Sequence, residues 1–265
     1  MDINRKPVII NATVLLTAAA IMEATLHDLG NLIAARQMGA KHIDLYHNAV
    51  TFLNSGLSDR RMVLVAASGP LVSLFLGFFF HFLCLEKMTR TPGFLFMLFL
   101  SAFGYISFFG SMIATPFFSS TGFGFISTNL GFPMGIKLIA AIVGALCLFL
   151  IIRNLMKFFV EMGTRETAVS RTKRATLLSS ILLFPALAGV IALPILSLPV
   201  YSFSGIIGPI CYPLALLVAY TTGLRDEVEV DLMNPDLSAL EKINYSWVVF
   251  LGLLVLVSQI LVFWY

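Results

Sequence analysis

Long stretches without a charged residue constrain the fold of this chain more than any other feature. They lie between Arg61 and Glu86, between Arg90 and Lys137, between Arg174 and Arg225, and after Lys242. A membrane-spanning helix needs about 20 mostly apolar residues, so each stretch has room for one or two such helices. Hydrophobic residues make up 58% of the chain and charged residues 12%, more apolar surface than a soluble domain of this size can bury. The pattern predicts an all-α polytopic membrane protein, integral to a membrane and surrounded by lipid.

The apolar segments predict six to seven transmembrane helices. Taken one by one they give seven, at residues 8–35, 62–85, 93–115 and 134–157, two within 175–222, and one at 245–265. The pair within 175–222 is expected to be kinked or broken, because it contains Pro185, Pro194, Pro199, Pro209 and Pro213. We expect a membrane core at 1–160 and C-terminal helices at 161–265, with an acidic connection at 225–242.

The connections between these spans carry most of the charge. Lys and Arg residues are spread over them and the net charge is only +3, which suits anionic lipid headgroups better than nucleic acid. The three cysteines lie in apolar runs without paired spacing, which argues against disulfides and against a C-x-x-C metal site. Between the first two spans, Ile43 and Leu45 alternate with polar neighbours and give a short strand-like signal.

A cluster of polar residues interrupts the first predicted span. Glu23, His27 and Asn31 are four residues apart and therefore share one face of a helix, with Asp28 beside His27. Ionisable side chains inside a membrane span are costly and usually face the interior of the helix bundle, where they mark functional sites. A purely structural explanation is also open, in which Glu23 and His27 pair with each other and keep neighbouring helices in register.

The segment around this cluster, "LHDLGNLIAARQMGAK", resembles the H-E-x-G-H-x-x-x-A-R-x-x-G segment of the site-2 protease family of intramembrane zinc metalloproteases. About 40 residues later, "DRRMVLVAASGPLVSLFLG" resembles the A-G-P-x-x-N-x-x-x-A helix of that family, with Gly69 and Pro70 in place. Gly30 matches the glycine of the first motif. The resemblance covers about residues 15 to 85 and extends weakly to about 135. It implies a site-2-protease-like core formed by the first three to four transmembrane helices.

The residues that would perform the chemistry depart from the family pattern. In an active member, two His residues bind zinc, and the Glu after the first His is the general base. Here His27 keeps the first ligand position, Asp28 is a shortened residue at the base position, and Asn31 replaces the second ligand. Ser73 stands where the family has Asn in the Gly-Pro helix.

The family's third ligand is an Asp followed by Gly. At the matching place this chain has Gly122 and Gly124 without a carboxylate, and no Asp or Glu occurs between Glu86 and Glu161.

A substitute metal site would need other ligands. Glu23 and His27 form an i, i+4 pair that could bind a metal, with a third ligand from His42, His47 or His81. His81 lies deep in the second span and is more typical of a packed histidine bonded to a neighbouring carbonyl.

Three functions remain open. The first is a catalytically inactive site-2-protease-like protein that binds a partner's transmembrane segment or works as a subunit of a membrane complex. The second is an active intramembrane zinc metalloprotease with an altered metal site. The third is a transporter or channel, suggested by ionisable residues and proline-broken helices at membrane depth. We expect no cofactor in the first case and zinc in the second.

Overall fold

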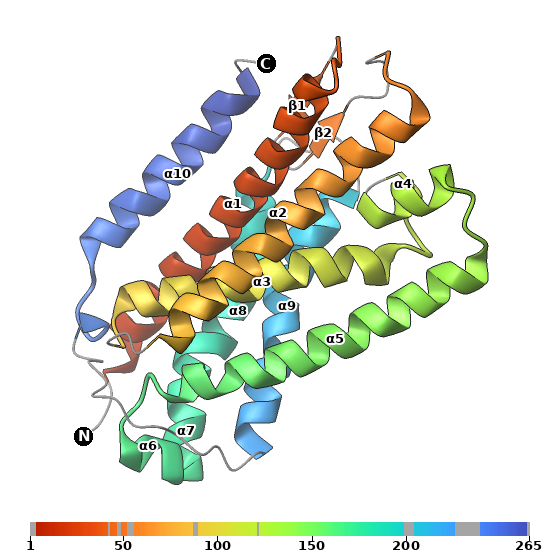
Figure 1. Ribbon diagram of the computed structural model, residues 1–265. Helices are drawn as coiled ribbons and strands as arrows, with labels where there is room; N and C mark the ends of the chain where they lie inside the picture. The colour runs from red at the N-terminus through yellow and green to blue at the C-terminus, as the bar shows by residue number, and fades with distance from the viewer. Residues whose placement is uncertain are drawn as a thin grey trace.

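The computed structural model describes residues 4–41, 43–46, 49–51, 56–86, 90–120, 122–198, 204–225 and 239–263, most of them in helices (Figure 1). The elements are α1 (Arg5–Gln37), β1 (Asp44–Tyr46), β2 (Ala49–Thr51), α2 (Asp59–Leu85), α3 (Pro92–Ala114), α4 (Gly122–Asn129), α5 (Met134–Val160), α6 (Arg165–Val169), α7 (Arg171–Leu178), the π-helical turn η1 (Ser179–Leu183), α8 (Phe184–Leu196), α9 (Ser204–Arg225) and α10 (Tyr245–Phe263).

Five helices in the described part of the chain are long and apolar enough to cross a membrane. They are α1, α2, α3, α5 and the continuous helix Arg171–Leu196, which joins α7, η1 and α8. The other two predicted spans are also helical, with shorter described apolar stretches at Gly208–Leu224 and Tyr245–Ile260. The length and composition of these helices support the predicted multi-pass, all-α membrane protein.

The strand-like signal after the first span is confirmed. Asp44 pairs with Thr51 in a small antiparallel hairpin of β1 and β2. This hairpin is the exception to an otherwise helical structure among the described residues.

The prolines of the 175–222 region are accommodated with less disruption than expected. Pro185 lies at the start of α8, directly after η1, where the helix widens into a π turn. Proline lacks a backbone N–H and its ring clashes with the carbonyl four residues earlier, and such irregular turns are a usual adjustment. Pro194, Pro209 and Pro213 lie inside helices. Pro199 falls outside the described residues.

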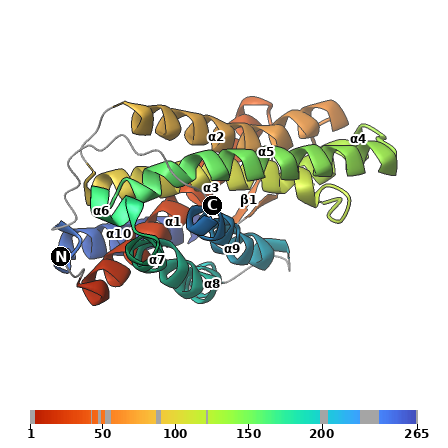
Figure 2. The same ribbon diagram turned by 90° about the horizontal axis from the view of Figure 1, so that it is seen from below.

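Helix α3 forms the centre of the bundle, with α2 and α5 packed on it from different sides (Figures 1 and 2). Its first half is buried almost without interruption, from Phe94 to Ser107. A Cβ atom added to Gly104 would lie 2.5 Å from the Ser73 carbonyl oxygen and 2.5 Å from the Gly77 nitrogen. Small residues at such crossings let two membrane helices approach closely and gain dispersion contacts.

Helix α10 packs on α1, and one side chain of α1 also binds the segment that leads into α10. The Asn11 amide of α1 donates hydrogen bonds to the carbonyls of Leu240 and Lys242, each at 2.8 Å, and its oxygen accepts the Asn244 N–H at 3.0 Å. Asn11 is 1% exposed and thus meets its hydrogen-bonding requirement entirely within the chain that leads into α10.

A buried ion pair joins the beginning of α3 to the end of α5. Arg90 donates a hydrogen bond to Glu161, and both side chains are almost completely buried. The guanidinium carbon of Arg90 also lies 4.2 Å from the centre of the Phe94 ring, close enough for a cation–π interaction.

We predict that Glu161→Gln lowers the free energy of unfolding by about 3 to 5 kcal/mol, because it removes a buried counter-charge of Arg90. The measurement is detergent-induced unfolding in mixed micelles. The matched control is Glu166→Gln, which removes the exposed pair of Glu166 with Lys173 and is expected to have little effect. Equal destabilisation by the two variants would contradict the assignment.

Candidate functional site

The polar residues of the first span meet α2 and α3 at a buried serine. Ser73 donates a hydrogen bond to Glu23 Oε1 at 2.5 Å, and its Oγ lies 2.9 Å from His27 Nδ1 and 3.1 Å from Ser107 Oγ. Ser73 has one proton. If that proton goes to Glu23, the imidazole donates from Nδ1, and a neutral His27 carries no proton on Nε2. We call Glu23, His27, Ser73 and Ser107 the Ser73 cluster.

This geometry changes the structural explanation of the polar stripe. In that explanation, which was one of the alternatives left open, Glu23 and His27 pair with each other. Here both contact Ser73, and no direct hydrogen bond joins them within the described structure. The prediction that these polar residues link neighbouring helices holds, since Ser73 belongs to α2 and Ser107 to α3. Oε2 of Glu23 is buried without a hydrogen-bond partner among the described residues.

Asn31 forms a second contact between α1 and α2, one turn further along. Its Oδ1 accepts the backbone N–H of Gly69 at 2.7 Å and the hydroxyl of Ser68 at 3.2 Å. The residue at the predicted second ligand position is therefore used to hold α1 against the Gly-Pro segment of α2.

The three motif residues with small or rigid side chains lie at this same contact. A Cβ atom on Gly69 would lie 2.5 Å from His27 Nε2 and 2.6 Å from Asn31 Nδ2, and one on Gly30 would lie 2.8 Å from Val72 Cγ2. Pro70 follows inside α2 and is buried. Glycine at both positions is what allows the two helices to approach closely enough for the Asn31 hydrogen bond.

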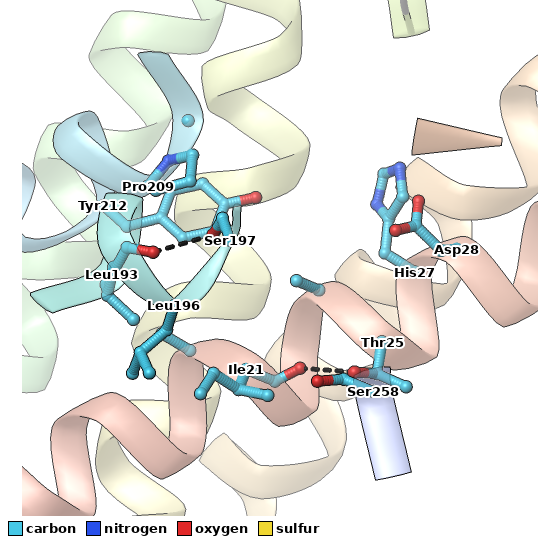
Figure 3. Close-up of a pocket in the computed structure, with 13 residues that line it drawn as sticks. Ile21, Thr25, His27, Asp28, Leu193, Leu196, Ser197, Pro209, Tyr212 and Ser258 are labelled. Carbon is cyan, nitrogen blue, oxygen red and sulfur yellow. Dashed lines mark hydrogen bonds between the residues drawn. The ribbon is translucent and has the colours of Figure 1, made fainter. Parts of the chain in front are cut away.

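Asp28 lies apart from these contacts and lines a cavity of about 160 Å³ between α1, α8, α9 and α10. Figure 3 shows His27 and Asp28 on one side of the cavity and Tyr212 with Ser197 on the other. The Tyr212 hydroxyl also lies close enough to the Glu23 and Ser107 side chains to interact with them by hydrogen bonding. We call this space the Asp28 cavity.

The region that the resemblance matches to the third zinc ligand, around Gly122 and Gly124, forms the tight connection from α3 into α4. Gly122 begins α4 with a φ of +50°, a left-handed conformation that favours glycine, and Ser111 Oγ accepts the N–H of Phe123 at 3.1 Å. A Cβ atom on Gly124 would overlap the Phe118 carbonyl oxygen. The two glycines therefore serve the compact path from α3 into α4.

The alternative ligands do not complete a site in the described structure. Nδ1 of His81 lies 3.1 Å from the Tyr105 hydroxyl, between α2 and α3, so its partner is a phenol rather than the expected carbonyl. His42 and His47 lie outside the described residues. Among those described, no group of three His, Cys, Asp or Glu side chains is placed to hold a metal ion.

The donor set around His27 does not fit zinc. The Asn31 oxygen bonds to the α2 backbone, the chain has no carboxylate between Glu86 and Glu161, and the described residues around His27 do not gather three ligands. Tetrahedral zinc sites need three or four imidazole, thiolate or carboxylate ligands.

Sequence reasoning missed three members of this site. Ser73 was identified only as a replaced residue, and Ser107 and Tyr212 were not identified. Serine and tyrosine are common in membrane helices, and nothing in the local pattern distinguishes these two from their neighbours.

Comparisons of the chain with protein-family models, curated proteins and solved structures find no match.

We predict that Gly69→Ala lowers the free energy of unfolding by about 1 to 3 kcal/mol, because the added methyl group must displace His27 or Asn31. Gly110→Ala is the matched control, since a Cβ atom there meets nothing within 4 Å. The control is expected to leave stability unchanged or slightly higher, because Ala favours a helix more than Gly. Unfolding in mixed micelles measures both, and an unchanged Gly69→Ala variant would contradict the close contact.

Proposed function

We propose that this chain is a catalytically inactive membrane protein with a site-2-protease-like core that binds the transmembrane segment of a partner protein. The observation that carries the first half of the proposal is the hydrogen bonding of Asn31. An amide that accepts the Gly69 N–H and the Ser68 hydroxyl stabilises the contact between two helices. It does so at the position where the resemblance would place an imidazole on zinc.

The surroundings of His27 support the same conclusion. Hydrolysis by a metalloprotease requires a metal-bound water and a base that reaches it. Here His27 and Asp28 both line the Asp28 cavity, but the Asn31 oxygen at the second ligand position is bonded to the α2 backbone. The second ligand position therefore offers no donor for a metal beside His27.

The surface of α5 supports the second half of the proposal. Its buried residues lie mostly in the second half of the helix, from Ile152 to Val160, where it packs on α3 and α9. The first half exposes large apolar side chains, among them Ile139 and Ile142, each 62% exposed. An exposed apolar surface of this kind suits packing against lipid or against another helix. In a protein without catalytic activity, we propose that it binds the transmembrane segment of a partner.

The absence of catalysis predicts the metal content. Protein purified without chelator is expected to contain far less than one equivalent of zinc, and His27→Ala should leave that content unchanged. Elemental analysis by mass spectrometry measures both. Near-stoichiometric zinc that disappears in His27→Ala would overturn the proposal and support an active protease with an altered site.

Partner binding predicts a position-dependent crosslink. A photoreactive amino acid at Ile139 of α5 is expected to give a discrete product with a membrane-spanning protein when illuminated in native membranes. The matched control is Val249 of α10, which is equally apolar and 61% exposed. Lipid adducts alone at Ile139, or the same product at both positions, would show that α5 offers no specific surface.

A further inference from the structure

Most of the polar side chains that line the Asp28 cavity are arranged to accept hydrogen bonds, and Tyr212 adds one hydroxyl that can also donate. Three hydroxyl groups donate their single proton to their own helix, from Thr25 to Ile21 O at 2.8 Å, from Ser197 to Leu193 O at 2.7 Å, and from Ser258 to Val255 O at 2.8 Å. Figure 3 shows the first two of these bonds. A hydroxyl whose proton is engaged in this way keeps only lone pairs for a ligand.

The Asp28 carboxyl adds the strongest acceptor. It is 8% exposed, it lines the cavity, and no hydrogen bond to it is found within the described structure. No Lys or Arg is among the described residues that line this space. A carboxylate removed from water is costly unless a cation pairs with it.

A second carboxyl increases the demand for a cation. Glu23 is completely buried, lies close enough to Asp28 to interact with it electrostatically, and leaves its Oε2 without a partner among the described residues. Glu23 does not line the cavity itself, but it adds a second buried acidic group near Asp28. The imidazole nearby among the described residues, His27, has its Nδ1 bonded to Ser73.

The rest of the lining is mostly apolar and consists of Ala20, Ile21, Ala24, Leu193, Leu196, Gly208 and Pro209. His27 and the phenol of Tyr212 are the other polar side chains among the described residues that line it. The volume of about 160 Å³ is close to that of an engineered apolar cavity that accommodates benzene, so it suits a ligand of roughly five or six heavy atoms. A ligand that fits both parts has a head that donates hydrogen bonds and carries positive charge, and a short hydrocarbon tail.

We propose that the Asp28 cavity is a binding site for a short primary ammonium ion, with the –NH₃⁺ group on Asp28 and the hydroxyl oxygens and the alkyl chain against the leucines. An ammonium group has three donors and no acceptor, which matches a lining of acceptors. This inference goes beyond the proposed function and is independent of it, since it requires neither a metal nor a partner protein.

The test is calorimetric titration of n-butylammonium chloride into the full-length protein in lipid nanodiscs, with empty nanodiscs as the blank. Saturable binding is expected. Asp28→Asn should weaken it by about 10- to 100-fold, since a hydrogen bond to a charged group contributes that much. Saturable binding of 1-butanol or of sodium ion with similar affinity would overturn the assignment to an ammonium ion.

A second pair of variants keeps the test decisive if Asp28→Asn does not fold. Thr25→Val keeps the side-chain shape and removes one acceptor from the cavity, so affinity should fall by about 2- to 10-fold. Thr221→Val is the matched control, because Thr221 also donates to its own helix, at Val218 O, but does not line the cavity. Equal affinity in the two threonine variants would contradict the site. Zinc content and the α5 crosslink stay unaffected by either result, so the two proposals fail separately.

Discussion

The central constraint on this structure is that polar side chains inside a membrane must find partners within the protein. Lipid offers no hydrogen bonds, so an unsatisfied polar group at that depth costs several kcal/mol. Ser73 is where this constraint is met, because its single hydroxyl contacts side chains from α1 and α3 at once. The positions of these three helices relative to one another follow from that one group and from the glycines beside it.

The glycines explain why the polar contacts can form. Gly69 brings the α2 backbone within reach of Asn31, and Gly104 brings α3 against Gly77. Polar contacts and close backbone approach therefore depend on each other: without the glycines the Asn31 bond would be too long, and without the polar bonds the helices would have only dispersion to hold them.

The sequence predicted the helices well, because a membrane-spanning helix is defined by the length and apolar composition of one continuous segment. It identified Gly30, Asn31, Gly69 and Pro70 as motif positions, and the structure has Asn31 bonded to Gly69. It did not predict Ser107 or Tyr212, because their roles depend on which faces of α3 and α9 turn toward α1. It placed Asp28 in the same site as His27, and both residues line the Asp28 cavity. Of the two, His27 also contacts Ser73, because neighbouring residues on a helix point about 100° apart.

The Asn11 contact has a consequence for how the protein is made. Its amide bonds to residues 229 and more positions later in the chain, just before the last helix. During synthesis α1 is therefore made long before these partners, and the Asn11 amide is without them until residues 240–244 have been added. A chain truncated before residue 240 would therefore leave the Asn11 amide of α1 without these three hydrogen bonds.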